Sequence, residues 1–198
     1  MGHYDPDGNF LVGKKRLRPY HLPIAGIEKK INIYLASTTS FIIYDPLLGW
    51  THRPRSRSTN NLYFLNADGI RAAAPECFIS KEPPPGTLRI ALFGDSFTFG
   101  ADVPFQETWG YYLQDEIEKS GVRAEVLNFG VGGYGMDQAY LRWKEVGCKF
   151  SPDIVIFGFH PENVKRNVNL IRSLYVPQTG IPFSKPRFVL EDGRLRLI

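Results

Sequence analysis

LRIALFGDSFTFG, residues 88–100, is an apolar run that ends abruptly at a polar turn. The residues from Ile90 to Phe93 are apolar throughout and predict a buried strand, which Gly94 interrupts. Asp95 and Ser96 then follow the carboxyl end of that strand, which is where ligands bind in open α/β sheets. A tight turn after a strand can present a hydroxyl outward, so Ser96 is a candidate nucleophile.

Two more strands follow in this half of the chain, over residues 125–129 and 153–159. Apolar residues at helical spacing between Trp109 and Ile117 predict a helix before the second strand, and residues 136–147 predict another before the third. The βαβαβ order predicts an α/β fold, a three-layer α/β/α sandwich with a flavodoxin-like parallel sheet. With the strand order 2-1-3, the third strand would be an exposed edge that promotes aggregation, so we expect a poorly stable chain.

A proline-rich connector, KEPPPGT at residues 81–87, separates this regular half from an irregular one. Before it, short apolar pieces such as Ile31–Leu35 and Phe41–Tyr44 alternate with turn residues. We expect residues 1–85 to be an N-terminal extension of short strands and loops packed on the core. Residues 86–198 then hold the main domain.

Composition indicates a globular protein, with 43% apolar and 22% charged residues in 198. The net charge of +4 lies in the N-terminal part, because residues 86–198 contain 13 basic and 13 acidic residues. The basic clusters at 14–18 and 53–57 indicate solvated faces more than a nucleic-acid site. The sequence has no apolar run of the roughly 18 residues that span a membrane, and its N-terminus lacks a signal-peptide pattern. The compartment stays open.

The two cysteines of the sequence do not indicate a metal site or a disulfide framework. Cys77 and Cys148 lack metal-ligand spacing and are interpreted as buried free thiols. We expect no metal and no cofactor.

Each of the three predicted strands ends near a residue suited to acyl transfer. Ser96 follows the first strand, Gly133 lies in NFGVGGYG after the second, and Asn163 ends GFHPEN after the third. Acyl transfer needs a nucleophile and hydrogen-bond donors that face the developing oxyanion. A serine hydroxyl, a glycine backbone N–H and an asparagine amide supply these parts.

These blocks resemble those of the SGNH/GDSL hydrolase family, and LGW, NADGIR and KPRF are similar to pieces of its extended bacterial members. The resemblance implies that Ser96 is the nucleophile and an oxyanion donor, with Gly133 and Asn163 as the other donors. It implies a serine esterase or acyl hydrolase that forms a seryl acyl-enzyme. Its partner would be a small-molecule or carbohydrate ester, such as a carbohydrate O-acetyl or lipid ester, with no nucleic acid and no membrane span. The oligomeric state stays open.

The sequence departs from the family at its last block, Asp-x-x-His, which supplies the catalytic base. None of the four histidines, His3, His21, His52 and His160, has an Asp three residues before it. The chain ends 35 residues after Asn163, so we expect the natural C-terminal part with the base to be missing. His160 is the local candidate for a substitute base, although a pocket-lining histidine is the favoured interpretation.

Other interpretations stay open for the same residues. Ser96 would otherwise be a loop hydroxyl, Asn163 a helix N-cap and Asp95 a structural acceptor for loop N–H groups. The glycines of GVGGYG also satisfy G-x-G-x-x-G, which would indicate a nucleotide-binding α/β domain. A further alternative is a catalytically inactive remnant that binds an acylated ligand or a partner.

Overall fold

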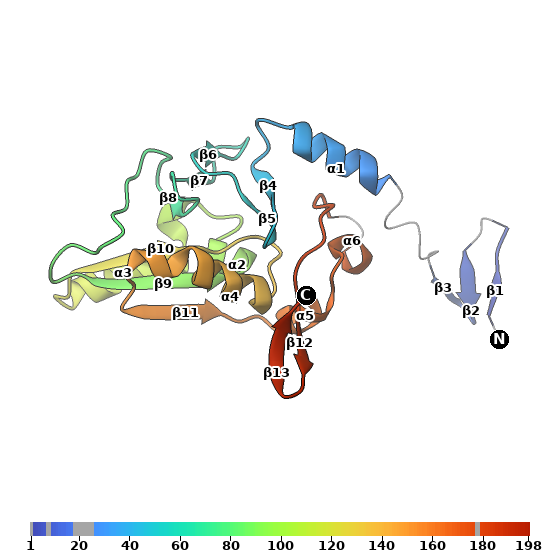
Figure 1. The fold of residues 1–198 in the computed structure, drawn as a ribbon. Coiled ribbons are helices and arrows are strands. Elements are labelled where there is room, and N and C mark those ends of the chain that lie inside the picture. The colour runs from blue at the N-terminus through green and yellow to red at the C-terminus, as the bar shows by residue number, and fades with distance from the viewer. Residues whose placement is uncertain (1, 7–8, 18–25, 177–178) are drawn as a thin grey trace.

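The computed structural model describes residues 2–6, 9–17, 26–176 and 179–198 (Figure 1). His21 lies outside these residues. The helices and strands, in chain order, are β1 (Gly2–Tyr4), β2 (Phe10–Val12), β3 (Lys15–Leu17), α1 (Ile27–Ala36), β4 (Ile42–Asp45), β5 (Gly49–His52), β6 (Ser56–Arg57), β7 (Phe64–Leu65), β8 (Arg71–Ala72), β9 (Leu88–Gly94), α2 (Ser96–Phe99), α3 (Trp109–Lys119), β10 (Ala124–Asn128), α4 (Met136–Glu145), β11 (Ile154–Gly158), α5 (Glu162–Val168), α6 (Arg172–Tyr175), β12 (Phe188–Glu191) and β13 (Arg194–Leu197).

The central sheet has six strands in the order β11-β9-β10-β8-β7-β6. β9 lies between β10 and β11 and runs parallel to both, with Ile90 opposite Val126 on one side and Ile154 on the other. The predicted order 2-1-3 of the three parallel strands is confirmed. Among the described residues β11 is the edge strand, because no further strand pairs with its free side. All three carboxyl ends therefore meet at one edge of the sheet.

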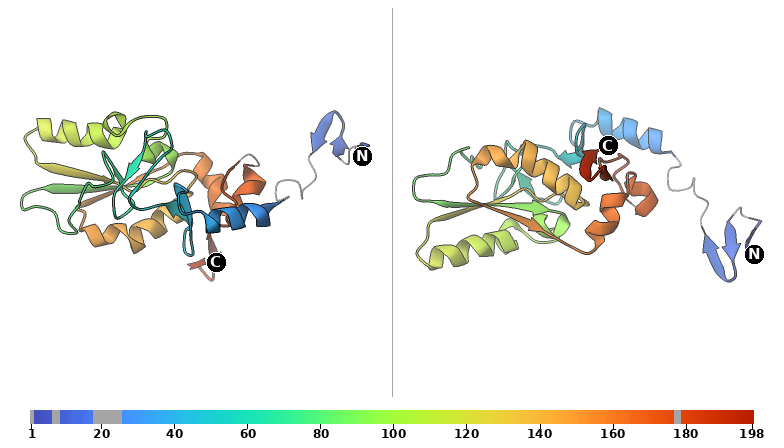
Figure 2. Two further views of the ribbon diagram at one scale, coloured as in Figure 1. Left: turned by 90° about the horizontal axis from the view of Figure 1, so that it is seen from above. Right: turned by 60° about the horizontal axis from the view of Figure 1, so that its bottom comes forward.

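Helices cover both faces of this sheet, which confirms the three-layer sandwich (Figure 2). On one face α3 approaches so closely that a Cβ on its Gly110 would lie 2.8 Å from Leu92 Cδ1. On the other face α4 and the segment after it pack on the alternate residues of β9 and β10. This core cluster consists of Ile70, Ala91, Phe93, Leu127, Phe129, Ala139 and Phe150. Side chains alternate between the two faces because successive residues of a strand point to opposite sides.

The N-terminal segment contributes strands to the same sheet. β8 pairs antiparallel with the end of β10, where Asn128 lies opposite Arg71, and β7 and β6 continue the sheet outward. The interpretation of Ile31–Leu35 as part of a strand-and-loop region was wrong, because these residues lie in helix α1. The division of the chain at residue 85 stays a prediction.

A buried arginine fixes the start of β9 and the connector before it. The Arg89 side chain is fully buried, and its Nη1 donates to the carbonyl oxygens of Ser80 and Lys81 at 2.9 and 2.8 Å. The same nitrogen donates to Phe150 O at 2.7 Å, and Nη2 forms an ion pair with Glu125 at 2.6 Å. Arg89 thus ties the proline-rich connector to the sheet.

Two further expectations concern the surface. None of the helices among the described residues combines the length and the apolar character needed to cross a membrane.

The prediction of buried thiols was wrong, since Cys148 is exposed and Cys77 only half-buried. An exposed loop or helix end leaves these side chains partly in water, which residue type alone does not indicate.

Candidate active site

The turn after β9 places Ser96 at the first residue of α2. Gly94 is required there, because a Cβ at this position would lie 2.2 Å from Thr98 Oγ1. Asp95 caps the short helix, with its Oδ1 accepting from the Phe97 N–H at 2.9 Å. Ser96 is half-buried, and no group among the described residues hydrogen-bonds to its Oγ. The hydroxyl is therefore available to a ligand.

The second block forms the loop between β10 and α4. It is joined to the end of β9 by the Val131 N–H, which donates to Gly94 O at 3.0 Å. Gly133 is buried and has a φ of +81°, a left-handed conformation that favours glycine. A Cβ on Gly133 would lie only 2.8 Å from Arg172 Cζ, so the guanidinium lies directly against this residue.

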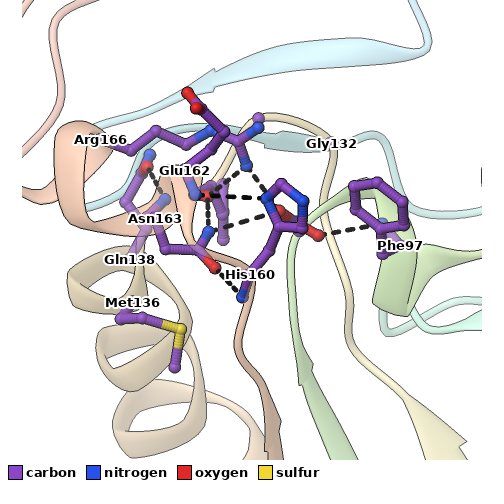
Figure 3. A network of polar contacts seen from close by, with 12 residues as sticks. Phe97, Gly132, Met136, Gln138, His160, Glu162, Asn163 and Arg166 are labelled. Carbon is purple, nitrogen blue, oxygen red and sulfur yellow. Dashed lines mark hydrogen bonds and ion pairs between the residues drawn. The ribbon is translucent and has the colours of Figure 1, made fainter.

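The third block brings Asn163 to the same place, from the first turn of α5. Its side chain is almost fully buried, and Nδ2 donates to Tyr134 O at 3.1 Å and to Asp95 Oδ2 at 3.3 Å. Its Oδ1 accepts from the His160 N–H at 2.5 Å (Figure 3). Asn163 therefore connects the turn before Ser96 with the loop that carries Gly133.

These contacts bear on the competing interpretations. The oxygen of Asn163 does bind a backbone N–H at the start of α5, but its amide nitrogen faces the other two blocks. Asp95 accepts from the Phe97 N–H in the first turn of α2, so its structural contact is a helix cap and not the predicted bond to loop N–H groups. It also forms an ion pair with Arg166, 2.6 Å from Oδ2 to Nη1, which the sequence reasoning missed. Arg166 lies three residues after Asn163 on α5, a spacing that places both on one helix face.

Two histidines lie near this edge of the sheet. The His160 ring stacks on Phe97, with centroids 4.7 Å apart, and its Nδ1 accepts from the Glu162 N–H at 3.3 Å (Figure 3). His52 is buried against Phe99, with ring centroids 4.5 Å apart. Burial, together with the positive charges of Arg142 and Arg71, lowers the pKa of His52 to about 3. This imidazole is neutral at pH 7.

Three basic side chains gather beside Gly133, and none was predicted as a site residue. Arg166, Arg172 and Lys185 line one small cavity with Gly133 and Trp50. Lys185 forms a buried ion pair with Asp137 of α4. No sequence pattern indicates Arg172, which reaches Gly133 from 39 residues further along the chain.

Of the three glycines in the G-x-G-x-x-G pattern, Gly130 and Gly135 pack against protein atoms, whereas a Cβ on Gly132 would meet no atom within 4 Å. A Cβ on Gly130 would lie 2.4 Å from Phe99 N, and a Cβ on Gly135 would lie 2.7 Å from Asn167 Oδ1. The Trp50 Nε1–H donates to Gly132 O at 3.1 Å. The loop is thus shaped by its contacts with α2, α5 and β5, which does not favour the nucleotide-binding alternative. Among the described residues, no three His, Cys, Asp or Glu side chains gather as a metal site.

Comparison with known proteins finds similar solved structures and a matching family model. A structure described as AlinE4, a SGNH-hydrolase family esterase, is 22% identical, with a TM-score of 0.38 over 50% of this chain and 53% of that chain. A variant of the same esterase gives the same values. The chain spans about half the length of these solved structures. A comparison with curated proteins finds no match. Residues 90–173, which contain Ser96, Gly133 and Asn163, match the family of GDSL-like lipases and acylhydrolases, so this part of the chain is similar to that family.

Proposed function

We propose that the protein hydrolyses carboxylic esters through an acyl-enzyme on Ser96. The observation that carries this proposal is the junction of the three blocks at one edge of the sheet. Asn163 Nδ2 lies 3.3 Å from Asp95 Oδ2, next to Ser96, and 3.1 Å from Tyr134 O, next to Gly133. Such a junction supports one nucleophile with several donors around it.

The oxyanion would be held by the backbone N–H groups of Ser96 and Gly133 and by the Asn163 amide. Preorganised donors of this kind are worth about 3–4 kcal/mol each when they face the developing charge. The bond from Asn163 to Asp95 is long, whereas Arg166 binds the same carboxylate at 2.6 Å. We infer that a bound oxyanion replaces the longer bond, while Arg166 keeps Asp95 neutralised.

In the reaction, Ser96 Oγ forms a bond to the ester carbonyl carbon while its proton passes to a base. As the tetrahedral intermediate collapses, the ester C–O bond breaks and the base returns the proton to the leaving alcohol. Water then loses a proton to the base and attacks the acyl carbon, which releases the acid and restores the Ser96 hydroxyl. Carbohydrate O-acetyl esters and lipid esters both fit this chemistry. The described residues supply no base in hydrogen-bond contact with Ser96 Oγ.

The proposal is tested with p-nitrophenyl acetate on the 198-residue chain and on Ser96→Ala. We expect release of p-nitrophenolate by the wild type and a fall to the uncatalysed background in the variant. Ser120→Ala is a matched control, because Ser120 is exposed at the end of α3, and its rate should equal that of the wild type. Equal rates for wild type and Ser96→Ala would contradict the proposal and support the inactive remnant.

A second arm of the same assay examines the proton acceptor. Because His160 Nδ1 already accepts a backbone N–H and its ring stacks on Phe97, we expect His160→Ala to keep its rate. A loss of turnover with an unchanged circular dichroism spectrum would instead identify His160 as the base.

A further inference from the structure

The cavity beside Gly133 contains more positive than negative charge. Of its three basic side chains, Arg166 is paired with Asp95 and Lys185 with Asp137. Arg172 forms no ion pair with any carboxylate of the described residues. Two carboxylates therefore balance three cations, and the remaining charge belongs to Arg172.

The unpaired guanidinium is also largely removed from water. Burial lowers the pKa of Arg172, and the charge of Arg166 lowers it further, while Asp95 opposes the shift. Its Nη1 donates to Gly133 O at 3.3 Å and its Nε to Thr179 Oγ1 at 3.1 Å. Arg172 is half-buried, and a charge that is partly removed from water without an ionic partner costs free energy, which a bound anion would offset.

Unused donors point to the same place. Arg172 Nη2 makes no hydrogen bond within the described part of the chain. Arg166 Nε is buried and has no hydrogen-bond partner there either. Buried donors in native proteins are usually satisfied, by protein or by a bound molecule, and Arg166 Nε is such a donor. Two arginines thus have donor capacity left beside one glycine.

We propose that the protein binds esters that also carry an anionic oxygen group, which is a carboxylate, a sulfate or a phosphate. Arg172 would be the principal contact of this anionic group. This inference rests on the proposed function, because Gly133 is then both the oxyanion donor and the neighbour of Arg172. A guanidinium suits such a group, since its N–H groups match two oxygens of one anion.

The dimensions of the cavity agree with this ligand. Its volume is about 10 Å³, close to the space that one water-sized atom occupies. One oxygen of the anion fits between Gly133 and the arginines, and the remainder of the ligand would lie outside. The anionic group would therefore lie beside the proposed oxyanion site. Because the two sites are neighbours, we expect the anionic group and the ester to belong to one molecule.

The test follows binding directly and does not depend on turnover. The ¹⁵N-labelled chain is titrated with acetate, sulfate and phosphate in turn, and the arginine Nε–H signals are recorded by NMR. Arg166→Lys and Arg172→Lys assign the two signals. We expect saturable shifts of both signals with at least one anion and none with neutral acetamide. The anion with the lowest Kd identifies the carboxylate, sulfate or phosphate class.

Variants then separate this site from general attraction of anions. Arg172→Gln should raise the Kd about 10- to 100-fold, as expected from the loss of a charge-assisted hydrogen bond. Arg196→Gln removes an exposed arginine of β13 and should leave the Kd unchanged. Ser96→Ala should also bind anions as the wild type does, so loss of ester hydrolysis and loss of anion binding are independent results.

Three results would overturn the inference. These are the absence of saturable shifts, an equal Kd in the wild type and Arg172→Gln, and an equal effect of Arg196→Gln. If Arg172→Gln does not fold by circular dichroism, the Arg172→Lys variant replaces it in this comparison. A Kd for Arg172→Lys equal to that of the wild type with all three anions would then count against recognition by the guanidinium.

Discussion

A buried charge lies at each end of β9, positive at the start and negative after the end. The polar groups around these two charges differ in how completely they are hydrogen-bonded. At the start of β9, Arg89 donates to backbone carbonyls and to Glu125, and all its nitrogens have partners. Just after its end, Asp95 is also fully buried and paired with Arg166. There, however, Arg166 Nε has no partner, and neither the Arg172 charge nor the Ser96 hydroxyl is matched among the described residues.

The difference separates a structural polar network from a binding site. A buried network stabilises a fold when every member is satisfied, as around Arg89. Donors left free at the other end lower stability and are retained where a ligand completes them. The same strand thus combines an anchored start with a carboxyl end that is prepared for an anion.

The largest effect is expected at the anchored end. Arg89→Met keeps most of the side-chain volume but leaves several carbonyls and Glu125 without their donor. We expect the free energy of unfolding, measured with urea, to fall by about 3–5 kcal/mol, the usual result of removing one partner from a buried pair. Arg123→Met is the matched control, since Arg123 is exposed near the same edge, and it should change stability by less than about 0.5 kcal/mol. Equal losses in the two variants would contradict the structural role of Arg89.

A smaller loss of stability is expected when His52, near the carboxyl end of β9, is protonated. The pKa of buried His52 is about 3 in the folded protein, against 6.5 for the ordinary side chain. The unfolded chain therefore binds more protons between these values, and stability falls as pH decreases through this range. From pH 7 to 5 the loss attributable to His52 is about 2 kcal/mol.

The control for this titration is His52→Phe, which keeps the ring beside Phe99 but cannot be protonated. Urea unfolding at both pH values should show a weaker pH dependence in this variant. The same dependence in both proteins would show that His52 does not carry it.

The smallest effect on stability is expected for Arg172→Gln. Its hydrogen bonds to Gly133 O and Thr179 are at 3.3 and 3.1 Å, and the buried charge that they accompany is itself unfavourable. We expect a change within about 1 kcal/mol, well below that for Arg89→Met. The two variants are compared in one urea series without added anion. A loss as large as that of Arg89→Met would remove the distinction between the two ends.

Much of the sheet could be predicted, because apolar runs and their spacing indicate local structure. The strands predicted over 88–93, 125–129 and 153–159 correspond closely to β9, β10 and β11. Helix α1 was missed, since its sequence IEKKINIYLA contains β-branched residues and buries no side chain completely. The pairing of β8 with β10 was missed as well, because two-residue strands have no periodicity to detect.

The site was predicted only in part. The roles of Ser96, Gly133 and Asn163 stay predictions, but the structure brings the three blocks together through the contacts of Asp95 and Tyr134. The cations around them were not foreseen. Basic residues are common on surfaces, and only the fold shows which of them lose water and lack a partner.

The parallel strands and their order could be predicted from the sequence alone, because these features depend on local patterns. The places where charge remains unbalanced depend instead on tertiary contacts. Arg172 and Gly133 are 39 residues apart along the chain, and their contact depends on how the loops fold over the sheet. The unpaired charge of Arg172 costs free energy at this contact, since a charge is costly only where water is excluded.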